Sequence, residues 1–216
     1  MDTLTDAARV VLLGGASGSG KSYLARRYGR PHLPLDAFYF QQSDDGGGSG
    51  PVFPRTPYGE IDWDHPGTWN EQAAVDAVVE LLEEGVTRVP DYDISTSSVL
   101  GHTAVSLEPD GVIVAEGIFA EEMPAALTRA GVPFEAWYID QWRGTTAVRR
   151  FGRDVAERRK PVPFLVQRGW ALYRTDAERR AHALAAGFAP RSKARLKREL
   201  TALAMTGAVG GVGGSA

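Results

Sequence analysis

A glycine-rich stretch near the N-terminus carries residues whose types and spacing could do chemistry. Gly14 to Ser22 reads Gly-Gly-Ala-Ser-Gly-Ser-Gly-Lys-Ser and follows an apolar run. Four residues separate Gly15 from Gly20, so successive backbone N–H groups can surround phosphate oxygens. Lys21 can then reach the outer phosphates, and the Ser22 hydroxyl can ligate magnesium. The pattern predicts a phosphate-binding loop between a buried strand and a helix, whose positive dipole end faces the ligand.

The lysine of this loop stands out against the composition of the chain. Only four of the 24 basic residues are lysines, and one occupies the position that a phosphate-binding loop requires. The alternative interpretation is a glycine-rich turn without a ligand, and this placement argues against it. We expect ATP to bind with Mg²⁺ through Gly15, Ala16, Ser17, Gly18, Ser19, Gly20, Lys21 and Ser22.

Two carboxylates follow apolar stretches further along the chain. Asp36 lies at the distance expected for the end of a second strand, and Glu116 ends the buried run Val112 to Ala115. A carboxylate at a strand end can accept the proton of an attacking hydroxyl or hold magnesium through water. Either acid alone is equally typical of a helix cap or a turn. With Lys21 and Ser22, however, the two acids form a coherent set for phosphoryl transfer.

Apolar runs predict the elements that must position these residues. Strand-like runs occur at Val10 to Leu13, Gly111 to Ala115 and Phe134 to Ile139, with helical patterns between them. Such alternation predicts an α/β fold of three layers, in which helices cover both faces of a mainly parallel sheet.

Two helical regions have recognisable boundaries. Thr68-Trp69-Asn70-Glu71 has the form of a capping box that opens an amphipathic helix, and Gly85 is expected to end it. Between Arg174 and Arg198 the pattern favours a helix, a turn at Gly187 to Pro190, and a further helix.

Length and composition exclude several classes. The chain of 216 residues suits one domain, and the absence of cysteine excludes disulfides and thiolate metal sites. A net charge of -3 and a pI near 5.8 argue against nucleic-acid binding as the main role. Met1 to Arg9 lacks the pattern of a secretory signal, and no apolar run is long enough to cross a bilayer. We therefore expect a cytoplasmic protein without a membrane partner.

The ordered motifs resemble the uridine kinase and phosphoribulokinase branch of the P-loop kinases. The matching segments are Gly-Ala-Ser-Gly-Ser-Gly-Lys-Ser at 15–22, Leu-Asp-Ala-Phe-Tyr at 35–39, Asp62 to Pro66, Pro90 to Asp93, Ala115 to Ile118 and Arg153 to Arg158. The resemblance implies a P-loop NTPase fold with a helical lid. It also implies a magnesium-dependent kinase that transfers the γ-phosphoryl group of ATP to a small acceptor, with the 5′-hydroxyl of a nucleoside as first choice.

The resemblance assigns roles to single side chains. It implies that Asp36 is the catalytic base and that Asp64 holds the ribose hydroxyls of the acceptor. Tyr92 corresponds to the aromatic wall of the nucleobase pocket. Glu116 corresponds to a magnesium-side acid, and with Ser22 and Asp36 it completes the expected metal ligands.

A basic segment corresponds to the mobile lid of the family, at about residues 143–168. Seven basic residues lie between Arg143 and Lys160, and Pro161 can end a helix there. The lid side chains implied by the resemblance are Arg150, Arg153, Arg158 and Lys160. Three of them fall close to one helical face, where guanidinium groups could neutralise the transferring phosphoryl group. Arg153 and Arg158 are therefore expected to share catalysis with Lys21, whereas a basic solvent-exposed face is the alternative.

The expected organisation is one kinase domain at residues 1–206. It contains a flexible insertion at about 41–58, rich in Asp, Gly, Ser and Pro, and is followed by a disordered Gly-rich tail at 207–216. The sequence leaves the oligomeric state open, a homo-oligomer included.

One departure from the family concerns the acceptor. Uridine kinases carry a histidine and an arginine for base recognition where this chain has Ser97 and Val99. The nucleoside hypothesis rests on Asp64 and Tyr92, while a kinase of another ribose-type or pantothenate-like alcohol is the main alternative. A nucleotide-binding switch without transfer activity is a further one.

Overall fold

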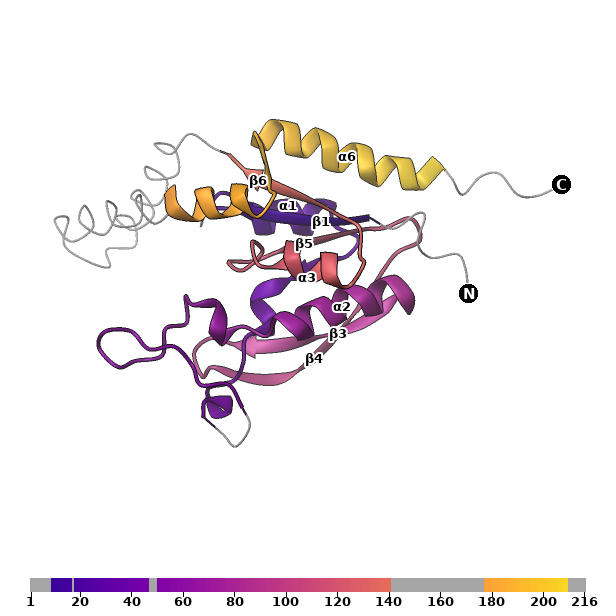
Figure 1. Cartoon of the computed structure of the whole chain (residues 1–216). Coiled ribbons are helices and arrows are strands. Elements are labelled where there is room, and N and C mark those ends of the chain that lie inside the picture. The colour runs from indigo at the N-terminus through magenta and orange to yellow at the C-terminus, as the bar shows by residue number, and fades with distance from the viewer. Residues whose placement is uncertain (1–8, 17, 47–49, 141–176, 210–216) are drawn as a thin grey trace, which may run out of the picture.

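The computed structural model describes residues 9–16, 18–46, 50–140 and 177–209 (Figure 1). Its centre is a five-stranded sheet in the order β2-β5-β1-β6-β7. These strands are β1 (Arg9–Gly15), β2 (His32–Pro34), β5 (Val112–Glu116), β6 (Phe134–Ile139) and β7 (Ala189–Arg191). Every pairing in this sheet is parallel, which confirms the predicted α/β architecture.

The central strand is buried on both faces because its side chains alternate between two cores. Val10 and Leu12 belong to one hydrophobic cluster, whereas Val11 and Leu13 belong to the other. All four side chains are at most 2% exposed. Each such side chain contributes about 1.5–3 kcal/mol when it is fully buried. The apolar run before the glycines therefore fixes the sheet to which the loop is attached.

Helices cover both faces of the sheet and complete three layers (Figure 1). The helices α1 (Lys21–Tyr28) and α6 (Lys193–Val209) pack on one face through Leu24 and Leu196. On the other face lie α2 (Glu71–Glu83) and α3 (Met123–Arg129), which contribute Leu81 and Leu127.

An antiparallel hairpin extends the molecule beyond α2 and was not anticipated from the sequence. It consists of β3 (Val86–Asp93) and β4 (Ser98–Ser106), and Figure 1 shows it beneath α2, away from the main sheet. Tyr92 lies before the tip of the hairpin, and Ser97 and Val99 lie at and after it. The hairpin therefore determines where these three residues lie.

The start of α2 differs from the predicted capping box. Asn70 is the N-cap, and its side-chain oxygen accepts the Ala73 N–H at 3.0 Å. Thr68 lies two residues earlier in a 3₁₀ turn, where its buried hydroxyl donates to the His65 carbonyl at 2.8 Å. The helix itself is confirmed, and Gly85 follows it with φ of 75°. The threonine was a misleading signal because its hydroxyl bonds backward along the chain instead of into the helix.

The C-terminal region contains a strand where only a turn was expected. Residues 177–185 form a helix, Gly187 turns the chain with φ of 92°, and β7 then pairs with the edge of β6. The buried Phe188 precedes this strand. Helix α6 continues to Val209, past the position at which the Gly-rich tail was expected to begin. Within the described segments, no helix is long and apolar enough to cross a bilayer.

Candidate active site

The phosphate loop connects β1 to α1 at the carboxyl edge of the central strand. Gly20, the residue before the helix, has φ of 96°, and Gly18 has φ of 76°. Side-chain-bearing residues rarely adopt these angles, so the glycines are required by the course of the loop. Ser17 lies outside the described residues. The remaining residues of the loop lie together between β1 and α1, as predicted.

Lys21 points back along the loop that precedes it. Its Nζ donates to the Gly15 carbonyl at 2.6 Å, and the residue is only 8% exposed. Burial lowers the pKa of Lys21, while the negative charges of Glu116, Glu121 and Asp36 partly oppose this shift. The ammonium group therefore lies among carboxylates at the loop, where phosphate charge would be neutralised.

Glu116 ends β5, directly beside β1, where it is paired in register with Leu13. One carboxylate oxygen accepts the Ser22 hydroxyl at 3.1 Å, and the other lies 3.2 Å from Nε2 of His32. Burial alone would raise the pKa of Glu116, but these hydrogen bonds and the charges of His32 and Lys21 outweigh burial and lower it. The carboxylate is thus held ionised next to the loop.

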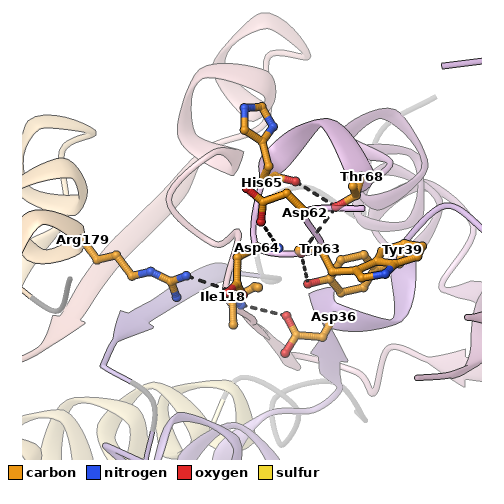
Figure 2. A network of polar contacts seen from close by, with 9 residues as sticks. All are labelled: Asp36, Tyr39, Asp62, Trp63, Asp64, His65, Thr68, Ile118 and Arg179. Carbon is orange, nitrogen blue, oxygen red and sulfur yellow. Dashed lines mark hydrogen bonds and ion pairs between the residues drawn. The ribbon is translucent and has the colours of Figure 1, made fainter. Parts of the chain in front are cut away.

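Asp36 reaches the same edge from β2. It lies in the 3₁₀ turn Leu35–Phe38 that follows the strand, and its Oδ1 accepts the Ile118 N–H at 2.7 Å (Figure 2). Gly117 makes this approach feasible, because a Cβ atom there would lie 2.5 Å from the same oxygen. Solvent reaches the side chain of Asp36, but partial desolvation and the charge of Glu116 still raise its pKa. The hydrogen bond from the Ile118 N–H and the charge of Lys21 oppose this rise without cancelling it.

The donor set of this edge suits magnesium. A hydroxyl from Ser22 and a carboxylate from Glu116 already touch, and both are hard oxygen ligands. No cluster of three histidine or acidic side chains suited to a metal occurs in the part of the chain that the structure describes. The Ser22 hydroxyl and the Glu116 carboxylate fit Mg²⁺, which protein sites commonly bind with one or two side chains plus phosphate oxygens and water.

Asp64, the predicted acceptor ligand, lies in a segment held by hydrogen bonds. Thr68 donates to the Trp63 and His65 carbonyls, and Tyr39 donates to the Trp63 carbonyl at 3.1 Å (Figure 2). Asp64 itself is exposed, and its backbone N–H donates to Asp62. The surrounding contacts fix the backbone while the carboxylate of Asp64 remains accessible.

A cavity of about 260 Å³ lies beside Asp64. It is lined by Asp64, Pro66, Ile118, Phe119, Glu121, Glu122, Glu178, Arg179 and His182. Arg179 extends from the helix 177–185 toward Asp64, and its Nη2 lies 3.8 Å from Oδ1 (Figure 2). The positive charge of Arg179 partly opposes the rise in the pKa of Asp36. The cavity is thus bordered by Asp64 and by Ile118, whose N–H donates to the candidate base Asp36.

Tyr92 does not line this cavity. Its ring stacks on Tyr39, with 5.4 Å between the ring centroids and 27° between the planes. Tyr39 also makes edge contacts with Trp63 and Phe119. Tyr92 is thus part of an aromatic cluster next to the segment that carries Asp64.

The two positions that depart from the family contact the start of the insertion. The Val99 N–H donates to the side-chain oxygen of Gln41 at 3.0 Å, and the Gln42 N–H donates to the Ser97 carbonyl at 2.9 Å. Ser97 has φ of 48° at the tip of the hairpin. The buried Phe53 anchors the described part of the insertion against Trp63 and Phe40.

The predicted lid cannot be compared with this geometry, because Arg150, Arg153, Arg158 and Lys160 lie outside the described residues. Conversely, no sequence pattern predicted that His32, Glu121 or Arg179 would lie near this site. Arg179 belongs to the helix predicted after Arg174, but the direction of its side chain depends on how that helix packs. His32 could only be placed once β2 was known to pair with β5.

The chain is similar to proteins named uridine kinase in sequence and to a solved kinase structure in fold. Uridine kinase from Clostridium botulinum (strain 657 / Type Ba4) is 26% identical over 167 residues, covering 73% of this chain and 75% of that protein. Uridine kinase from Ligilactobacillus salivarius is 26% identical over 159 residues, covering 70% and 69%. A solved structure described as a fructose transport system kinase, from Silicibacter sp. TM1040, superposes with a TM-score of 0.55 at 17% identity, covering 82% and 88%. No protein-family model matches the chain.

The fold and the loop define the chain as a protein of the α/β P-loop NTPase fold, and the structural neighbour superposes on the same fold. Within that class, the curated relatives confirm the resemblance of the chain to the uridine kinase and phosphoribulokinase-like family.

Proposed function

We propose that this chain transfers the γ-phosphoryl group of ATP to a hydroxyl of a small acceptor. The observation that carries the proposal is the convergence of Lys21, Glu116 and Asp36 at one edge of the parallel sheet, where the charges of both acids oppose the lowering of the Lys21 pKa by burial and the charge of Lys21 in turn favours the ionised form of each acid. A base, a buried cation and a magnesium-side acid are the groups that phosphoryl transfer requires.

Asp36 accepts the proton of the attacking hydroxyl in this proposal. Its raised pKa makes the carboxylate of Asp36 a stronger base than that of an ordinary aspartate. Lys21 balances the charge of the outer phosphates, and the loop N–H groups orient them. Ser22 and Glu116 hold magnesium, which neutralises phosphate charge when bound. Arg153 and Arg158 of the lid are proposed to follow the transferring group.

The acceptor is proposed to bind in the cavity beside Asp64. Our first choice is the 5′-hydroxyl of a nucleoside, because Asp64 can accept hydrogen bonds from two ribose hydroxyls and relatives named uridine kinase match most of the chain. Tyr92 is proposed to flank the base, with Arg150 and Lys160 closing the pocket.

A kinase of a different small alcohol is the second candidate. It is favoured by the contacts of Ser97 and Val99 with Gln42 and Gln41, since the family's base-recognition positions are here joined to the insertion. The base pocket would then have a different wall, while the phosphate chemistry would remain.

Coupled ADP release with MgATP tests the proposal. The purified chain is assayed with uridine, cytidine, purine nucleosides, pantothenate and ribose-type alcohols, and without any acceptor. Stimulation by a nucleoside supports the first choice, and stimulation only by another alcohol supports the second. Tight ATP binding without stimulation by any compound would contradict the kinase proposal and favour a nucleotide-binding switch. The Asp36→Asn variant serves as the control for contaminating kinases.

A further inference from the structure

His32 lies beside the acid that we propose for magnesium, and the phosphate-loop motif does not require it. Its Nε2 is 3.2 Å from Oε1 of Glu116, whereas Oε2 of the same carboxylate accepts the Ser22 hydroxyl. The side chains of His32 and Glu116 are 17% and 8% exposed. Glu116 is therefore held from two sides, by a strand residue and by the first turn of α1.

The position of His32 follows from sheet pairing. Strand β2 pairs in parallel with β5, with His32 opposite Val114 and Pro34 opposite Glu116. Side chains two residues apart in a strand share a face, so His32 and the end of β5 meet on one side of the sheet. The imidazole lies there with little exposure to water, and hydrogen bonds at such sites are stronger than at an exposed surface.

The chemistry of the contact defines its direction. An ionised carboxylate only accepts hydrogen bonds, so Nε2 of His32 must carry the proton in this arrangement. One oxygen of Glu116 is then committed to the imidazole. The other faces Ser22, the second residue proposed for the metal.

We propose that His32 is a positioning residue for the metal site, which fixes the carboxylate of Glu116 so that one defined oxygen lies beside Ser22. Hydrogen-bond partners of metal ligands commonly act in this way, and their loss typically costs about 10–100-fold in metal affinity. The inference rests on the proposed function only through nucleotide and magnesium binding. It requires nothing of the acceptor.

Three substitutions separate positioning from simple packing. His32→Phe keeps a ring of similar size and removes the donor. His32→Gln places an amide nitrogen close to the position of Nε2 and should restore the contact. His102→Phe is the matched control, because His102 is exposed on β4 and its side chain forms no hydrogen bond within the described residues.

The readout is binding of Mn²⁺ to protein saturated with ADP, measured by electron paramagnetic resonance. Titration calorimetry of ADP with and without MgCl₂ accompanies it. We expect His32→Phe to weaken Mn²⁺ binding about tenfold and to leave metal-free ADP affinity unchanged. His32→Gln should lie within about threefold of the wild type, and His102→Phe should match it.

Equal Mn²⁺ affinity in the wild type and in His32→Phe overturns the positioning role while leaving the proposed function intact. Failure of the wild type to bind Mn²⁺ with ADP overturns the magnesium site itself and the inference with it. If His32→Phe does not fold by circular dichroism, His32→Asn takes its place, because its shorter amide ends one bond short of the Nε2 position. Unchanged metal affinity in a folded His32→Asn protein has the same meaning.

Discussion

The proposed phosphate side and the proposed acceptor side of this site are built in different ways. On the proposed phosphate side, β1, β2 and β5 of one parallel sheet deliver the loop, Asp36 and Glu116. Glu116 accepts the Ser22 hydroxyl of the loop, and Asp36 accepts the N–H of Ile118, two residues after Glu116. On the acceptor side, Asp64 comes from an exposed turn and Arg179 from a helix, and their closest atoms are 3.8 Å apart. The buried core therefore fixes the geometry of the proposed phosphate side but not that of the proposed acceptor side.

This difference separates the residues whose relative positions are fixed by the fold from those whose positions can vary. Strand ends in a buried sheet can shift only if the core repacks, so residues attached to them keep their relative positions. Turns and hairpin tips tolerate sequence change at little cost to stability. We therefore expect the transfer chemistry to follow the family, whereas acceptor preference depends on a few peripheral contacts.

The largest effect should follow from Asp36→Asn on the phosphate side. This substitution removes the proposed base but keeps the shape of the side chain, so kcat should fall by about 10³-fold while ATP affinity is retained. The measurement is steady-state kinetics with titration calorimetry of ATP. Asp76→Asn, at an exposed position on α2, is the matched control and should retain activity. An Asp36→Asn variant within threefold of the wild-type kcat removes Asp36 from the base role.

The pH dependence of activity should report the same carboxylate. Partial desolvation and Glu116 raise the pKa of Asp36 above its ordinary value of 3.8. Since the ionised form is the base, kcat/KM should be full at pH values above the raised pKa and fall as the pH drops through it. The acid limb should therefore lie above the range of an ordinary aspartate. A limb at or below pH 3.8, in a protein that circular dichroism shows to be folded, would contradict the environment described for Asp36.

Arg179→Gln tests the acceptor side and should have an intermediate effect. Loss of the guanidinium beside Asp64 should raise the acceptor KM about tenfold, the equivalent of about 1.4 kcal/mol, and leave the KM for MgATP unchanged. Arg180→Gln is the control on the same helix, since Arg180 instead pairs with Asp140 at the end of β6. Equal effects of the two substitutions would indicate a loss of helix stability or net charge and would exclude a specific contact.

The same contrast explains how far the sequence could predict this molecule. The sequence pattern correctly predicted a buried strand at Val10 to Leu13, a glycine loop after it, and Glu116 at the end of another strand. At these positions the local residue pattern and the burial in the fold agree. Thr68 was wrongly taken as a helix cap, since Thr68 and Asn70 both suit an N-cap and only the backbone geometry decides between them. The hairpin and the neighbours of Glu116 depend on pairing between distant segments. His32 has no local signal at all, because its role exists only through β5.

The smallest effect that we expect concerns Gln41, which joins the insertion to the hairpin. Its side-chain oxygen accepts the Val99 N–H, so Gln41→Ala should release one of the positions that replace the family's base-recognition residues. Removing one such hydrogen bond costs about 0.5–1.5 kcal/mol. Gln42→Ala is the matched control, because Gln42 contacts Ser97 through its backbone N–H, which alanine retains. We expect the ratio of kcat/KM values for two acceptors to change about threefold in Gln41→Ala alone, with MgATP kinetics unchanged. A change in the KM for MgATP would show that the hairpin is coupled to the phosphate side, and the division of the site into two independent regions would then be wrong.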